Sequence, residues 1–166
     1  MSLGFRIKHH FFSAFREIFV HHHGSLEFRA KILALVIAAN DKPKVENYII
    51  VRNLGLQIYQ EDEDRANLLM LSTKELVKKV QDNNGLDLDT LVSHIQKELK
   101  IIPRYAKKID IEALKPIIAL SDDSDTIAYQ ENILDFLQNL KDETLSTKKD
   151  QIVEAEKKLL QENLPK

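Results

Sequence analysis

The segment between about residues 26 and 40 constrains the fold more than any other part of the chain, because as a helix it is apolar on nearly every side. Its most apolar run covers only residues 32–39, well short of the ~18–20 residues that cross a bilayer. A helix that is apolar all round has to be enclosed by other elements of the fold. The segment therefore predicts a central, buried helix.

The rest of the chain repeats apolar side chains at spacings of three and four residues, which is typical of amphipathic helices. Glycine and proline are scarce, with four of each, and alternation with a period of two is hard to find. Besides the central helix, helices are expected to start near residues 5, 43, 61, 87, 110, 127 and 146. We predict an all-α helical bundle of seven to eight helices and no sheet.

Particular residues set the expected helix boundaries. Gly55 is expected to end the third helix, because glycine commonly terminates helices. The pair Ser72-Thr73 is expected to interrupt the fourth helix, and Ser146 or Thr147 to cap a separate, highly charged last helix. On this pattern the chain has three units: an aromatic and histidine-rich N-terminal helix (1–24), a helical bundle (25–145) and a charged C-terminal helix (146–166).

Two stretches of the chain resemble each other. Residues 33–41 read LALVIAAND and residues 114–122 read LKPIIALSD, so each is an apolar helix end that leads into a turn with an aspartate. After the turn, residues 46–54 begin ENYII and residues 131–140 begin ENILD. The pattern predicts pseudo-duplicated helix–acidic turn–helix halves. The alternative is that any two amphipathic helix hairpins look alike.

With its two acidic turns, AAND followed by Glu46 and ALSDD followed by Glu131, the chain resembles the TerB-like family. That family is named for tellurite-resistance proteins and also occurs at the N-terminus of DnaJ-type co-chaperones. The sequence departs from the family pattern because Lys42 and Asp123 stand where a glycine follows the aspartate. The resemblance covers roughly residues 26–141. It implies a helical bundle with two related halves, a divalent-metal site made from the acidic turns, and no enzymatic activity.

The acidic turns supply the candidate metal ligands. Carboxylate oxygens suit Ca²⁺ or Mg²⁺, and Zn²⁺ also accepts them. The EF-hand pattern is excluded, because no glycine stands at the turn position that such a loop requires. The alternative is that these carboxylates only cap the helices that follow them. The six candidates are Asp41, Glu46, Asp122, Asp123, Asp125 and Glu131.

The N-terminal segment carries two further features. Its histidines, at positions 9, 10 and 21–23, lack the i,i+4 pair by which one helix offers two metal ligands, so solvated or capping side chains are the main interpretation. Its aromatic face could bind an unknown protein partner or a membrane surface, could mediate homo-oligomer formation, or could pack on its own bundle. That face consists of Phe11, Phe12, Phe15 and Phe19.

Composition excludes several classes of function. There are no cysteines, so disulfides and Cys-type zinc sites are excluded, and a net charge of −2 with a pI near 6.3 argues against nucleic-acid binding. No phosphate loop, dinucleotide fingerprint, nucleophile elbow or zinc-protease motif occurs. We expect a cytoplasmic protein, with membrane association as an option. The expected function is non-enzymatic binding of TerB-like type, in stress response or at the cell envelope. The alternatives are a docking module without a metal and a carboxylate-based hydrolase.

Overall fold

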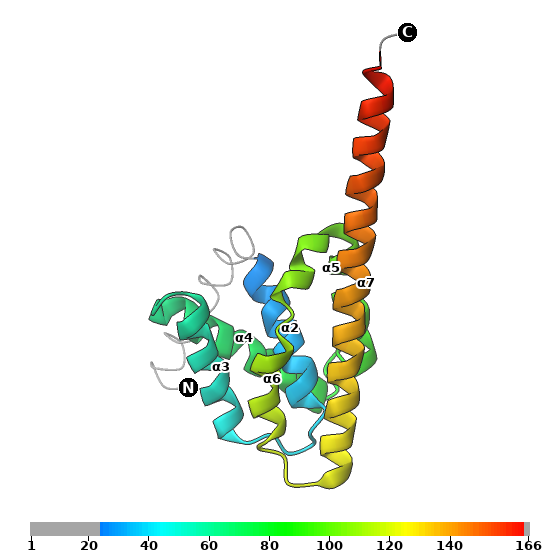
Figure 1. Cartoon of the computed structure of the whole chain (residues 1–166). Helices are drawn as coiled ribbons and strands as arrows, with labels where there is room; N and C mark the ends of the chain where they lie inside the picture. Colours follow the sequence, from blue (N-terminus) through cyan, green and yellow to red (C-terminus); the bar gives the residue numbers. More distant parts are fainter. Residues whose placement is uncertain (1–23, 165–166) are drawn as a thin grey trace.

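The computed structural model describes residues 24–164. Within that range, helices pack as a bundle and no strand occurs, so the predicted all-α fold is confirmed (Figure 1). The expected helix near residues 5–22 lies outside the described residues. The described elements are α2 (Gly24–Ala38), α3 (Val45–Ile58), α4 (Glu63–Gln81), α5 (Leu88–Ile101), the 3₁₀-helix η1 (Pro103–Lys108), α6 (Ile111–Ile118) and α7 (Ser124–Glu162).

Helix α2 is the centre of the bundle, as its composition predicts. It contacts α4, α5, α6, α7 and η1, and those helices surround it (Figure 1). Its aromatic ring at Phe28 is fully buried and lies 5.2 Å from the ring of Tyr105 in η1. The described part of the helix begins at Gly24, and Ser25 lies inside it. Its buried side chains are Leu26, Phe28, Ala30, Ile32, Leu33, Ala34, Leu35, Val36, Ile37 and Ala38.

Helix α3 does not end at Gly55, so that prediction is wrong. The helix continues to Ile58, and Gly55 is buried against α4 at the start of that helix. A Cβ atom added at Gly55 would stand only 2.8 Å from the Cα of Ala66. The glycine is there because the two backbones approach closely, and its small size rather than its backbone freedom is what the fold uses.

Helix α4 continues through Ser72-Thr73 without the expected interruption. The hydroxyl of Thr73 is buried and donates a hydrogen bond of 2.7 Å to the carbonyl oxygen of Leu69, one turn earlier. Because this bond satisfies the hydroxyl within its own helix, the threonine does not compete for backbone groups elsewhere. The segment therefore stays helical while its polar side chain lies in the core.

Helix α7 is one helix of 39 residues where two were expected. Ser146 and Thr147 lie inside it and cap nothing, because the chain has no glycine or proline from Ser124 to Glu162 that would stop the helix. The N-terminal part of α7 packs on the bundle, whereas every side chain from Lys149 to Leu164 is exposed. The helix thus extends well beyond the other elements (Figure 1).

Candidate functional site

The two acidic turns meet in the folded chain. The turn between α2 and α3 lies beside the turn between α6 and α7 at one end of the bundle (Figure 1). The ammonium of Lys44 lies 2.9 Å from a carboxylate oxygen of Asp122, and the amide of Asn40 donates to the hydroxyl of Ser121 at 3.4 Å. The repeat therefore places its turns side by side, although their direct contacts are an ion pair and a hydrogen bond.

A buried hydrogen-bond chain lies behind these turns. The hydroxyl of Ser121 donates to Oε1 of Gln130 at 2.7 Å, and Nε2 of Gln130 donates to the carbonyl oxygen of Val36 at 2.9 Å. Gln130 is only 1% exposed. Buried polar groups need such partners because leaving one unpaired costs about 1–3 kcal/mol. These two hydrogen bonds connect α7 and the turn before it to the central helix α2.

The six candidate metal ligands do not form one cluster. Asp122 faces Lys44, and Asp123 caps α7 by accepting the backbone N–H of Thr126 at 2.9 Å, so the capping alternative is confirmed for Asp123. The other four, Asp41, Glu46, Asp125 and Glu131, are exposed. Between residues 24 and 164, no three histidine, aspartate or glutamate side chains are grouped to hold a metal ion. The divalent-cation site stays a prediction from the sequence.

The capping role of Asp123 leads to a prediction about acid stability. The backbone and hydroxyl hydrogen bonds from Thr126 lower the pKa of Asp123. A carboxylate with a lowered pKa stabilises the fold above its unfolded pKa of about 4, and that contribution is lost as the pH falls through the lower folded value. Asp123→Asn keeps a capping oxygen without the charge. Its melting temperature should therefore be below that of the parent chain at pH 7, and the gap should close in acid.

A second test of this prediction uses Asp87, which caps α5 in the same way. Hydrogen bonds from the side chain and backbone of Thr90 lower its pKa in the same direction, so Asp87→Asn should show the same closing gap. Thermal unfolding followed by circular dichroism across the acid range measures both variants. A gap that is the same at every pH would contradict the assignment of charged caps.

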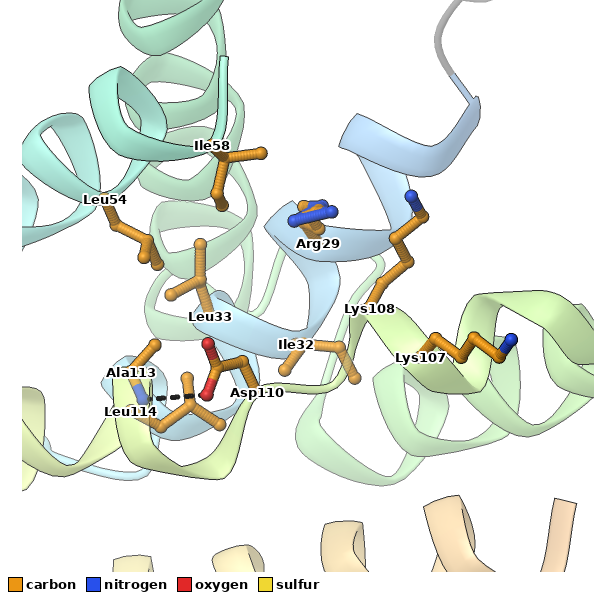
Figure 2. A pocket seen from close by; sticks show the side chains of 10 residues that line it. All are labelled: Arg29, Ile32, Leu33, Leu54, Ile58, Lys107, Lys108, Asp110, Ala113 and Leu114. Carbon is orange, nitrogen blue, oxygen red and sulfur yellow. Dashed lines mark hydrogen bonds between the residues drawn. The ribbon is translucent and has the colours of Figure 1, made fainter. Parts of the chain in front are cut away.

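A pocket of about 190 Å³ lies at the other side of α2, between α3, η1 and α6 (Figure 2). Its walls differ in character. Leu33, Leu54 and Ile58 gather on one side, whereas Arg29 and Lys108 stand on the other (Figure 2). The full lining consists of Arg29, Ile32, Leu33, Leu54, Ile58, Lys107, Lys108, Asp110, Ala113 and Leu114.

The cationic side of this pocket is not neutralised by the described part of the chain. Its single carboxylate, Asp110, caps α6 by accepting the backbone N–H of Ala113 at 3.2 Å, as the dashed line shows (Figure 2). The Nε atom of Arg29 is buried and has no hydrogen-bond partner among residues 24–164. Lys107 and Lys108 form no ion pair within residues 24–164. Three cations thus share the pocket with one carboxylate, which leaves the lining with a net positive charge.

Burial and mutual repulsion act on the pocket's titratable groups. Burial lowers the pKa of Lys108, and the neighbouring charges of Arg29 and Arg104 lower it further. Tyr59 does not line the pocket but lies near Arg29; burial raises its pKa, an effect that the charges of Arg29 and Arg65 partly offset. The hydroxyl of Tyr59 is also buried without a hydrogen-bond partner from the residues that the structure describes. Each of these cations would gain from a negative charge placed among them.

The sequence-based reasoning missed this pocket. The only local signal is the segment PRYAKK at residues 103–108, whose three cations are concentrated in a chain with a net charge of −2. Arg29 lies more than seventy positions away in the sequence, and its place beside Lys108 depends on how η1 folds over α2. The chemistry available here is binding of a small anion that carries an apolar group.

Comparison with protein-family models, with curated proteins and with solved structures finds no match for this chain. The likeness to the TerB-like family therefore stays a prediction based on the turn residues. The N-terminal histidines and the aromatic face with Phe11, Phe12, Phe15 and Phe19 lie outside the described residues. Among residues 24–164, no helix has the length and the apolar character needed to span a membrane.

Proposed function

We propose that this protein is a non-enzymatic binding protein whose pocket beside α2 takes a small amphiphilic anion. The observation that carries the proposal is the buried Nε atom of Arg29, which has no hydrogen-bond partner in the described part of the chain and lies in a pocket with two further cations. A buried guanidinium donor without an acceptor costs free energy. A carboxylate supplies the missing acceptor and the missing charge together, since guanidinium groups bind carboxylates through paired, charge-assisted hydrogen bonds.

The shape of the pocket supports a ligand with a short apolar part. Leu33, Leu54 and Ile58 form an apolar wall opposite Arg29 and Lys108 (Figure 2). At about 190 Å³, the pocket is smaller than the ~300–1,000 Å³ of sites for drug-sized ligands. A monocarboxylate fits a pocket with one cationic and one apolar wall. Its carboxylate would lie toward the cations, and the first carbons of its chain would lie against the leucine and isoleucine side chains.

The test uses octanoate as the probe and isothermal titration calorimetry with the full chain. Octanoate should bind saturably, whereas 1-octanol, which lacks the charge, and inorganic phosphate, which lacks the chain, should bind more weakly. Replacing Arg29 by leucine removes a charge-assisted contact worth about 1.5–3 kcal/mol, so the affinity should fall about 10- to 100-fold. The matched control is Lys97→Gln, which removes an exposed cation of α5 outside the pocket.

Arg29→Leu also separates a binding role from a structural one. Because the guanidinium is partly buried without a partner, an apolar replacement should leave the unliganded protein at least as stable as the parent chain. A variant that is stable but does not bind octanoate supports the proposal. The proposal fails if octanoate does not bind, or if Arg29→Leu binds it as well as the parent chain does.

A further inference from the structure

The C-terminal part of α7 stands apart from the bundle and carries an apolar face of its own. Lys148 is the last side chain that the bundle partly covers, and every residue from 149 to 164 is exposed. The exposed helical turns, residues 149–162, extend for roughly 21 Å at 1.5 Å per residue. Such a projecting helix (Figure 1) has no neighbour among the described elements.

The large apolar side chains of this projection fall on one side of it. They follow the spacing i, i+7, i+8, i+14 and i+15 that places side chains on one helix face. Their exposed fractions are large for apolar side chains: Ile152 50%, Val153 42%, Leu159 58% and Leu160 70%. The first member, Leu145, packs partly on the core. The opposite side of the helix carries Gln151, Glu154, Lys158 and Gln161.

Two opposite charges stand in the middle of this apolar face. Lys149 and Glu156 are seven residues, about two turns, apart, and both project between the column of Ile152 and Leu159 and the column of Val153 and Leu160. A lone charge in an apolar face opposes its burial unless the partner surface brings the opposite charge. The surface that covers this face must therefore present an acid opposite Lys149 and a base opposite Glu156.

We infer that the projecting part of α7 pairs with the same segment of a second copy of this chain in antiparallel orientation. A two-fold axis between positions 152 and 153 places Lys149 of each copy opposite Glu156 of the other, so the charge pair forms twice. The same axis sets Ile152 against Val153 and Leu145 against Leu160. Two-fold pairing of this kind uses one surface patch on both copies.

The charge order also selects the orientation. In a parallel pair, Lys149 would lie beside Lys149 and Glu156 beside Glu156, and like charges at close range destabilise the contact. A membrane would receive Glu156 in the middle of the inserted face, and an anionic surface would repel it. A second copy in antiparallel orientation is the occupant that satisfies both central charges at once.

The experiment measures the mass of the full-length chain by analytical ultracentrifugation over a dilution series. The parent chain should reach the dimer mass at high concentration. Lys149→Glu and Glu156→Lys should each weaken dimerisation at least tenfold, because each places like charges opposite each other twice. The control is Lys158→Glu, which makes the same change of charge on the opposite side of the helix and should not alter dimerisation.

Mixing the two single variants gives the decisive result. A Lys149→Glu chain and a Glu156→Lys chain have complementary central charges, so the equimolar mixture should form a heterodimer although each variant alone stays monomeric. The double variant with both substitutions should dimerise alone. A parent chain that stays monomeric, a mixture that does not associate, or a dimer that survives both single substitutions would each overturn the inference. Circular dichroism confirms that every variant keeps its helix content.

Discussion

Replacing Phe28 by alanine is expected to lower the free energy of unfolding by about 3–5 kcal/mol, the usual cost of truncating a buried aromatic ring. The side chain of Phe28 is fully buried in α2 and lies 5.2 Å from the ring of Tyr105. Removing it loses both the burial of the ring and its contact with η1, and α2 cannot move to fill the space because other helices surround it. Chemical denaturation followed by circular dichroism measures the loss.

The matched control is Tyr129→Ala, which removes an aromatic ring that is 48% exposed on α7. Substitutions on the surface usually change stability by no more than about 0.5 kcal/mol. Because small domains have only about 5–15 kcal/mol of stability in total, the two variants should be easy to distinguish. Equal and small effects at both positions would contradict a central position for α2.

Gly55→Ala is expected to destabilise the protein by about 1–3 kcal/mol, the range found when a packed interface is overfilled. The added Cβ would meet the Cα of Ala66 at 2.8 Å and its Cβ at 3.1 Å. One of these atoms belongs to the backbone, so α3 and α4 would have to separate. The same substitution in an open helix would stabilise the protein by about 1 kcal/mol, because alanine favours the helix.

The sign of the change in stability at Gly55 therefore distinguishes a close helix contact from an open helix position. Asn53→Ala is the control, since Asn53 is exposed on α3 two residues earlier and alanine should be neutral or slightly stabilising there. Urea denaturation of both variants compares the two signs directly. A gain of stability at Gly55 would mean that the two helices do not approach as closely as the structure shows.

These two residues illustrate what the sequence could and could not predict about the fold. The apolar character of α2 predicted a buried central helix, because a helix without a polar face has to be covered by other elements of the fold. Gly55 was misread as a helix end, since a glycine that ends a helix and one that lets two helices touch look alike in sequence. The last helix boundary failed similarly: Ser146 and Thr147 can cap a helix, but nothing in the neighbouring sequence stops α7.

The candidate sites could also be predicted only in part, because they depend on contacts between residues that are far apart in the sequence. The structure places the turns near Asp41 and Asp122 side by side, a proximity that the sequence alone could not establish. The sequence also could not predict that Lys44 would pair with Asp122. The pocket at Arg29 was beyond reach, because its cations come from α2 and η1 and are joined only by the packing of η1 against the central helix.

Gln130 also determines where the far end of α7 points. Its amide bonds to Val36 of α2 and to Ser121 in the turn before α7, so sliding α7 along α2 would break the buried hydrogen bond to Val36. From Gln130 to Glu162 the helix is a continuous rod of roughly 48 Å at 1.5 Å per residue. A tilt of about 5° at Gln130 would displace the tip of that rod by roughly 4 Å. The position of the projecting end therefore depends on how the N-terminal part of α7 packs, where Gln130 bonds to α2 and Ile133, Leu134 and Leu137 are buried.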